Sequence, residues 1–243
     1  MEKIVIEVNG LSKKFANSLA VKSMSFKINK GQTIGLLGPN GCGKSTTIGM
    51  LLGLIKPTSG SVMINGQNME NNRTDLLQKM NFISPYIELP KKLTIEENLQ
   101  VYGRMYGVKN LDNKIYEITE MLNLREFRKR KTGELSSGQK NRVSLAKAFI
   151  NDPEILLLDE PTASLDPDVG DYVRGIIENF ASNNKKTILI ASHNMSEVER
   201  LCDEVLMMKN GQIIDKGKSV DLIKNHGRKN LEEVFLKIVR NEK

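Results

Sequence analysis

A glycine-rich stretch near the start of the chain has the residue types and spacing of a phosphate-binding loop. The segment GLLGPNGCGKSTTI (residues 35–48) matches the pattern G-x-x-x-x-G-K-[ST] from Gly38 to Ser45. Glycines let backbone N–H groups approach phosphate oxygens without a clash from Cβ, and the Lys44 ammonium adds a positive charge. The Ser45 hydroxyl is an oxygen ligand of the kind that Mg²⁺ prefers. Because the loop lies between an expected strand and an expected helix, the sequence predicts a binding site for a nucleoside triphosphate.

Two carboxylates follow an apolar run later in the chain. Asp159 and Glu160 end the segment ILLLDE (residues 155–160), which has the composition of a buried strand. A carboxylate at the carboxyl end of such a strand can hold Mg²⁺, and the next one can accept a proton from an attacking water. His193 follows a second apolar run, TILIAS, and is expected in the same crevice, although a lone histidine is more often structural. The alternative for the carboxylates, a pair of ordinary loop charges, is disfavoured because the chain already holds a phosphate loop.

The segment LSSGQ (residues 135–139) precedes an amphipathic helical pattern in which Val143, Ala146 and Phe149 share a face. The first N–H groups of a helix are free and attract anions. Either Ser136 or Ser137 is a helix cap, for which serine is favoured, or the segment binds a phosphate. The segment alone leaves both interpretations open.

Taken in order, GPNGCGKST, LSSGQ, ILLLDEPTASLD and SHN resemble the ATP-binding subunits of ABC transporters over nearly the whole chain. The resemblance implies that two subunits associate head to tail, and that the LSSGQ segment of one binds the γ-phosphate held by the other. It also implies ATP and Mg²⁺ as cofactors and ATP hydrolysis coupled to transport as the reaction.

The resemblance implies roles for individual residues. Glu160 would be the general base and His193 would contact the γ-phosphate, while Ser45 and, through water, Asp159 would hold Mg²⁺. Residues that would bind ATP within the same subunit are Phe15, Gly38, Pro39, Asn40, Gly41, Cys42, Gly43, Lys44, Ser45 and Thr46. Residues that would bind the partner's ATP are Ser136, Ser137, Gly138 and Gln139.

Three residues, Phe15, Asp166 and Cys42, carry further expectations. Phe15 would stack on adenine, and its alternative is an ordinary core residue at a strand end. Asp166 would communicate across the dimer. Cys42, near a helix N-terminus, is expected to have a lowered pKa.

Two positions depart from the family pattern. Ser137 replaces the first glycine of the family's signature, and tolerance is expected because serine is small and leaves its N–H free. The glutamine that normally follows the strand before the helical lobe corresponds to Pro85, which offers neither a side-chain oxygen nor an N–H. Ser84, Tyr86 or Glu88 would substitute for it, or the water would be positioned by Glu160 and His193 alone. Slow basal hydrolysis is expected.

The elements that position these residues indicate an α/β fold. It is expected to be a P-loop NTPase core with an N-terminal antiparallel β subdomain and an inserted α-helical subdomain, in one domain over 1–243. The core would comprise 1–84 and 151–243, and the helical lobe about 85–150. Strands are expected at 3–8, 25–28, 33–38, 61–67, 80–84, 154–160 and 186–192, with a hairpin over 204–217 turning at Asn210-Gly211. Helices are expected at 44–55, 94–107, 112–124, 140–150, 168–181 and 230–240.

Composition limits the class of protein. The chain of 243 residues is 39% apolar and 27% charged, which disfavours disorder, and its two cysteines fit a reducing compartment. The net charge of +7 suggests an anionic partner. The basic run 128–131 lacks interleaved aromatics, so it indicates a solvated helix end, and no direct contact with nucleic acid is expected.

The expected partner is an integral-membrane permease. No leader sequence and no apolar run of membrane-spanning length are visible, which predicts a cytoplasmic subunit that is peripheral on the inner face of the cell membrane. The permease would dock near residues 85–107, and a homodimer of ATPase subunits is the simpler arrangement. The segment 227–240 resembles the short C-terminal helix of bacterial exporter ATPases, whereas importers more often carry an extra domain. The alternative is a soluble ABC ATPase acting on ribosomes or DNA.

Overall fold

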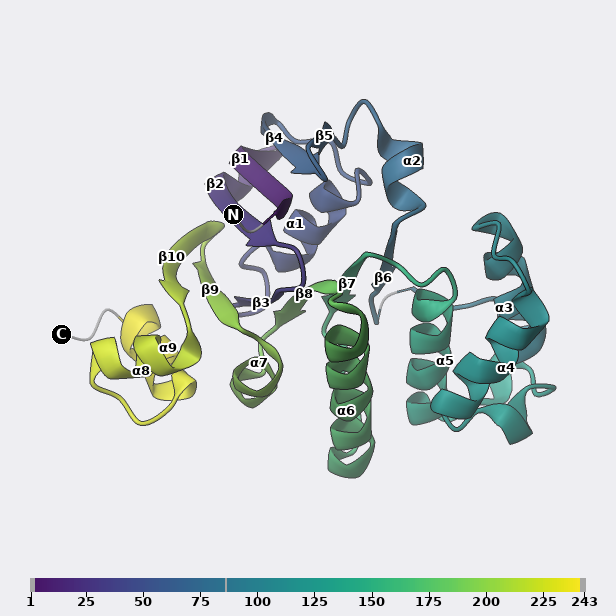
Figure 1. The fold of residues 1–243 in the computed structure, drawn as a ribbon. Helices are drawn as coiled ribbons and strands as arrows, with labels where there is room; N and C mark the ends of the chain where they lie inside the picture. The colour runs from purple at the N-terminus through teal and green to yellow at the C-terminus, as the bar shows by residue number, and fades with distance from the viewer. Residues whose placement is uncertain (1–2, 86, 241–243) are drawn as a thin grey trace.

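The computed structural model describes residues 3–85 and 87–240, whose strands form two sheets (Figure 1). The antiparallel sheet has the order β2-β1-β4-β5. Its strands are β1 (Ile4–Phe15), β2 (Ser18–Asn29), β4 (Ser59–Ile64) and β5 (Gln67–Asn68). Ile6, Ile28 and Ile64 of this sheet belong to the same buried cluster as Met50 of helix α1 (Lys44–Leu51), which therefore packs against the sheet.

The second sheet is mainly parallel and has the order β10-β9-β3-β8-β7-β6. Its strands are β3 (Thr33–Leu37), β6 (Met80–Ile83), β7 (Ile155–Asp159), β8 (Thr187–Ser192), β9 (Glu204–Lys209) and β10 (Gln212–Gly217). Alternate residues face opposite ways: Leu157 and Leu189 join the cluster that contains α1, while Leu158 and Ile190 join a cluster with helices α5 (Ser137–Phe149) and α6 (Pro167–Asn184). Both faces are covered, which is why these strands read as continuous apolar runs.

The helices surround this sheet. They are α1 (Lys44–Leu51), α2 (Arg73–Leu77), α3 (Ile95–Met105), α4 (Leu111–Met121), α5 (Ser137–Phe149), α6 (Pro167–Asn184), α7 (Met195–Leu201), α8 (Ser219–His226) and α9 (Leu231–Arg240), with 3₁₀ turns at Arg125–Phe127 and Thr132–Glu134. Helices α3, α4 and α5 follow one another between β6 and β7 and gather at one side of the molecule, while α8 and α9 lie beside β9 and β10 at the other (Figure 1). Phe149 of α5 stacks on Phe180 of α6 at 4.2 Å, which ties the helical group to the core.

The predicted α/β fold, with its antiparallel β sheet and its helical insertion, is confirmed. The expected strands and the hairpin turn at Asn210-Gly211 are present. The expected helix 44–55 ends earlier, at Leu51, and Gly53 has a positive φ of 63°. Helices α2, α7 and α8 were not predicted. Within the described ranges, no helix combines the length and apolar character needed to cross a bilayer.

The junction between the helical group and the core contains a half-buried lysine. Lys147 of α5 donates from Nζ to Asn81 Oδ1 at 2.9 Å and to the Phe82 carbonyl oxygen at 3.1 Å. The same ammonium lies 4.8 Å from the centre of the Phe82 ring and 5.5 Å from that of Tyr102. Burial lowers the pKa of Lys147 to about 8.

This lowered pKa predicts a pH-dependent stability. Between about pH 8 and the ordinary lysine pKa near 10.5, the unfolded chain binds more protons than the folded one, so the free energy of unfolding rises with pH across that window. From pH 7 to pH 9 the free energy of unfolding should rise by about 1 kcal/mol. Urea unfolding of the wild type and of Lys147→Met at both pH values measures it. The variant should lack this increment, and equal pH slopes in the two proteins would contradict the assignment.

Candidate active site

The predicted phosphate loop connects β3 to α1 and is closely packed. An added Cβ at Gly38 would lie 2.6 Å from both Cys42 Sγ and the Met208 carbonyl oxygen. Gly43 has a φ of 109°, and an added Cβ there would lie 2.6 Å from the Ala20 carbonyl oxygen. The loop can follow this path only with glycine at both positions, as the sequence pattern predicts.

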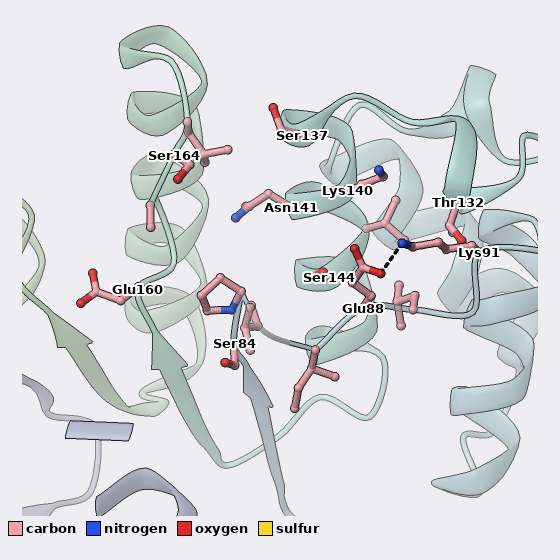
Figure 2. A pocket seen from close by; sticks show the side chains of 17 residues that line it. Ser84, Glu88, Lys91, Thr132, Ser137, Lys140, Asn141, Ser144, Glu160 and Ser164 are labelled. Atoms are coloured by element: carbon pink, nitrogen blue, oxygen red, sulfur yellow. Dashed lines mark ion pairs between the residues drawn. The ribbon is translucent and has the colours of Figure 1, made fainter. Parts of the chain in front are cut away.

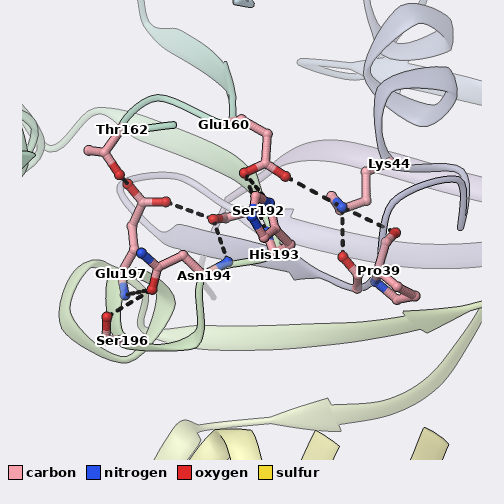
Figure 3. Close-up of polar contacts among 10 residues, drawn as sticks. Pro39, Lys44, Glu160, Thr162, Ser192, His193, Asn194, Ser196 and Glu197 are labelled. Atoms are coloured by element: carbon pink, nitrogen blue, oxygen red, sulfur yellow. Dashed lines mark hydrogen bonds and ion pairs between the residues drawn. The ribbon is translucent and has the colours of Figure 1, made fainter. Parts of the chain in front are cut away.

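Lys44, the first residue of α1, folds its side chain over this loop. Its Nζ donates to the carbonyl oxygens of Gly38 at 2.6 Å and Pro39 at 3.3 Å (Figure 3). The ammonium is almost fully buried and also lies 3.5 Å from Glu160 Oε1. A buried cation held by neutral carbonyls beside free loop amides is suited to contact phosphate oxygens.

Ser45 and Asp159, the predicted Mg²⁺ ligands, lie next to each other. Asp159 ends β7 and is buried. Burial raises the pKa of its carboxyl, while a hydrogen bond with the Ser45 hydroxyl opposes that shift. One carboxylate and one hydroxyl are the oxygen donors that Mg²⁺ takes together with water and substrate phosphates, so these residues fit the ion.

Glu160 and His193 meet beyond the ends of adjacent strands. His193 Nδ1 lies 2.8 Å from Glu160 Oε2, and the His193 backbone N–H donates to the same oxygen at 3.4 Å (Figure 3). Glu160 Oε1 is buried and makes no hydrogen bond within the described residues. Glu160 also has a φ of 50°, an uncommon conformation for a non-glycine residue that tends to occur at functional sites. The glutamate therefore has one oxygen held by the histidine and one that can accept a further proton.

The LSSGQ segment lies on a different element. Ser136 caps α5: its Oγ accepts from Gln139 N at 3.3 Å, and Gln139 Oε1 accepts from Ser136 N at 3.0 Å. The cap interpretation is thus confirmed for Ser136. Ser137 and Glu160 line opposite sides of a cavity of about 220 Å³, and the Glu160 side chain points away from α5 (Figure 2). The structure brings the phosphate loop, Asp159, Glu160 and His193 together and leaves the LSSGQ segment apart from them within one chain.

Comparison with known proteins gives the family. The family model described as ABC transporter matches residues 21–163, more than half of the chain. The chain belongs to the ABC transporter family.

Two curated relatives of this ABC protein are named as transport ATP-binding proteins. It is 36% identical to the Nod factor export ATP-binding protein I of Rhizobium sp. (strain N33), over 97% of this chain and 78% of the relative. It is 37% identical to the bacitracin transport ATP-binding protein BcrA of Bacillus licheniformis, over 94% and 74%.

Solved structures agree. One described as the ATP-binding subunit of an ABC transporter has a TM-score of 0.88 at 26% identity and covers 97% of this chain and 99% of its own. Another, a dimeric ATP-binding cassette in a post-hydrolysis state bound to ADP and Pi, has a TM-score of 0.81 at 25% identity, over 88% and 98%. The chain is accordingly an ATP-binding and ATP-hydrolysing subunit.

Three predicted residues of this ABC subunit have informative surroundings. Phe15, at the end of β1, is 45% exposed with Lys13 Nζ 4.8 Å from its ring centre, so it is no core residue. Asp166 is exposed and occupies the N-cap position of α6. Cys42 is 3% exposed, and burial raises its pKa. The expected lowering was wrong, because burial outweighs the nearby Lys44 charge.

The loop after β6, where the family carries a glutamine, lines the same cavity as Glu160. Ser84, Pro85 and Glu88 all contribute to it. Glu88 Oε2 pairs with Lys91 Nζ at 2.6 Å, so its carboxylate already has a partner (Figure 2). Tyr86 lies outside the described residues.

Two residues that sequence reasoning missed contact the segment that follows Glu160. Asn141 of α5 donates from Nδ2 to the Pro161 carbonyl oxygen at 2.8 Å. Glu197 of α7 accepts from the Thr162 hydroxyl at 2.6 Å. Asn141 could have been found from the sequence, because it lies two positions after the LSSGQ segment. Glu197 belongs to a helix that was not predicted.

Proposed function

We propose that this chain is the ATPase subunit of an exporter, that it dimerises head to tail around two ATP molecules, and that it drives a separate membrane permease. The observation that carries the proposal is the meeting of Lys44, Glu160 and His193 at the mouth of the phosphate loop. The names of the two relatives, for Nod factor export and bacitracin transport, favour export over a role on ribosomes or DNA.

In the proposed reaction, the loop amides from Asn40 to Thr46 and the Lys44 ammonium bind the phosphates of ATP. Ser45 and Asp159 would hold Mg²⁺, which when bound would supply positive charge beside the phosphate oxygens. Glu160 accepts the proton of the attacking water through Oε1, which makes no hydrogen bond among the described residues and lies 3.5 Å from Lys44 Nζ. His193 holds the other oxygen and contacts the γ-phosphate. Phe15 stacks on adenine with its exposed ring.

The second half of each ATP site comes from another copy of the chain. The residues proposed to bind the partner's ATP are Ser136, Ser137, Gly138 and Gln139, at the N-terminus of α5, where the positive end of the helix dipole favours an anion. Because they lie apart from the phosphate loop of their own chain, a neighbouring subunit must supply the complementary half. Asp166 is proposed to contact the partner across this interface, and the dimeric cassette among the similar structures supports a homodimer.

The permease is proposed to dock beside the helical lobe, about residues 85–150. A groove of about 490 Å³ lies there, lined by Phe82, Tyr102, Met105, Lys147 and neighbouring residues. Met105 is 68% exposed, which suits an apolar contact with a membrane protein. We therefore propose that the subunit lies on the inner face of the membrane. No nucleic-acid contact is proposed, since Arg128 pairs with Glu96 at 2.7 Å and Arg130 lies over the Phe127 ring.

The role of Glu160 predicts a trapped dimer. Glu160→Gln should lower turnover by about 10²- to 10⁴-fold, because the general base is lost while the neutral amide still fits. Size-exclusion chromatography with MgATP should then show a stable dimer. Glu154→Gln, at the other end of β7, is the matched control and should behave as the wild type. A Glu160→Gln enzyme with wild-type turnover would remove this residue from the role.

The proline at position 85 leads to the prediction that positioning of the attacking water limits the basal rate of ATP hydrolysis. Pro85→Gln supplies the missing amide and should raise the ATPase rate per site, within the roughly 100-fold that imperfect positioning can cost. Pro85→Ala removes the ring without adding an oxygen and is the control. If the glutamine variant hydrolyses ATP no faster than the alanine variant, the absence of a glutamine at position 85 does not limit the ATPase rate.

The transport role predicts a membrane partner. Mass spectrometry of material that co-purifies from detergent-solubilised membranes of the native cell should find a multi-span protein in stoichiometric amount. Met105→Arg should weaken its recovery, whereas Val220→Arg, at a residue 74% exposed on α8, should not. Recovery of ribosomal or DNA-bound material without a membrane protein would contradict the exporter proposal.

A further inference from the structure

Glu197 of α7 is a buried carboxylate to which the proposed reaction assigns no role. Its side chain is 1% exposed. Oε1 accepts a hydrogen bond from the Thr162 hydroxyl at 2.6 Å, and Oε2 accepts one from the Ser192 hydroxyl at 2.7 Å (Figure 3). The carboxylate therefore bridges two segments of the chain that come from different strands.

Both hydroxyl donors lie next to the proposed catalytic residues. Thr162 follows Glu160 by two positions, and Ser192 directly precedes His193. Glu160 and His193 contact each other at 2.8 Å. A closed ring of contacts results: from Glu160 through Thr162 to Glu197, then through Ser192 to His193 and back to Glu160.

Further hydrogen bonds hold the two residues that flank His193. The Ser192 hydroxyl oxygen accepts from Asn194 N at 3.0 Å, so its own proton is directed to Glu197. Asn194 Oδ1 in turn accepts from Glu197 N at 3.2 Å and caps α7. The side chains of Ser192 and Asn194, on either side of His193, thus both hydrogen-bond to Glu197.

The surroundings of Glu197 suit a carboxylate whose two oxygens accept hydrogen bonds. Burial raises the pKa of Glu197, while the two hydroxyl hydrogen bonds and the Arg174 charge oppose that shift and Glu160 adds to it. Burying a carboxylate is unfavourable unless its oxygens are satisfied. An apolar side chain would fill the same volume but could not orient two hydroxyls.

We propose that Glu197 is a positioning residue for hydrolysis, which holds Glu160 and His193 in contact through Thr162 and Ser192. It does not touch ATP. The inference rests on the proposed roles of Glu160 and His193. Its removal should slow the chemical step and leave ATP binding unchanged.

The test compares two glutamates of the same helix. Glu197→Ala removes the bridge to the active site. Glu199→Ala is the matched control, because Glu199 Oε1 accepts from Leu231 N at 2.6 Å and so anchors α7 to α9, away from the site. Glu197→Ala should lower kcat by about 10- to 100-fold, with the Kd for ATP unchanged. Glu199→Ala should retain wild-type kcat.

A double-mutant cycle separates positioning from general destabilisation. If Glu197 acts through His193, adding Glu197→Ala to His193→Ala should lower kcat little further. Fully additive losses, or equal losses of kcat in the Glu197 and Glu199 variants, would overturn the proposal. Should Glu197→Ala not fold, Thr162→Val removes one of the two hydrogen bonds to the Glu197 carboxylate, and Ser192→Ala removes the other together with the bond from Asn194 N. Each variant should lower kcat with the Kd unchanged; wild-type kcat in both would also overturn the proposal.

The same assays distinguish failure of the inference from failure of the proposed function. If Glu160→Gln and His193→Ala keep wild-type turnover, the proposed function fails. If those variants lose turnover while Glu197→Ala keeps it, only the positioning role of Glu197 is excluded.

Discussion

The parallel register of β3, β8 and β7 is the constraint on which the rest of this site depends. Leu37 is paired with Ser192, and Asp159 with Ala191, so these three strands end at one edge of the sheet. The phosphate loop, the Asp159-Glu160 pair and His193 follow directly from those ends. A slip of one residue would turn every side chain of a strand to the opposite face. The apolar layers on both faces of the sheet prevent such a slip, so the core holds the proposed catalytic residues in place as well as the fold.

The positive charge of Lys44 is paired with Glu160 at this edge of the sheet. Lys44 is almost fully buried, yet two loop carbonyls and Glu160 surround its ammonium. Glu160 in turn contacts His193. A buried ion is tolerated only with such partners. The arrangement is therefore preorganised: the lysine can exchange neutral carbonyls for phosphate oxygens without a new charge being buried in isolation.

The parts that sequence reasoning predicted are those with a strong local pattern. The segments 154–160 and 186–192 are continuous apolar runs, and a buried strand is what such runs form. Helices α2, α7 and α8 have five to eight residues and were missed, because so short a segment shows little periodicity. Glu197 could not be found, since its partner Thr162 lies 35 residues away and meets it only in the folded chain. The predicted direction of the Cys42 pKa shift was wrong for the same reason: the thiol is buried beside Gly38, in the same apolar cluster as Met208, and this burial depends on tertiary packing.

The segment from Glu160 to Asp166 is where the two proposed half-sites of one chain meet. Glu160 and Ser164 both have a positive φ, near 50° and 60°. Non-glycine residues keep such a backbone only where their surroundings hold it. Asn141 of α5 holds this segment from one side and Glu197 of α7 from the other. In the proposed dimer, α5 begins at the partner's ATP while Glu160 acts on the chain's own ATP. The Asn141 hydrogen bond therefore connects the helix that would begin at the partner's ATP to the residue next to Glu160.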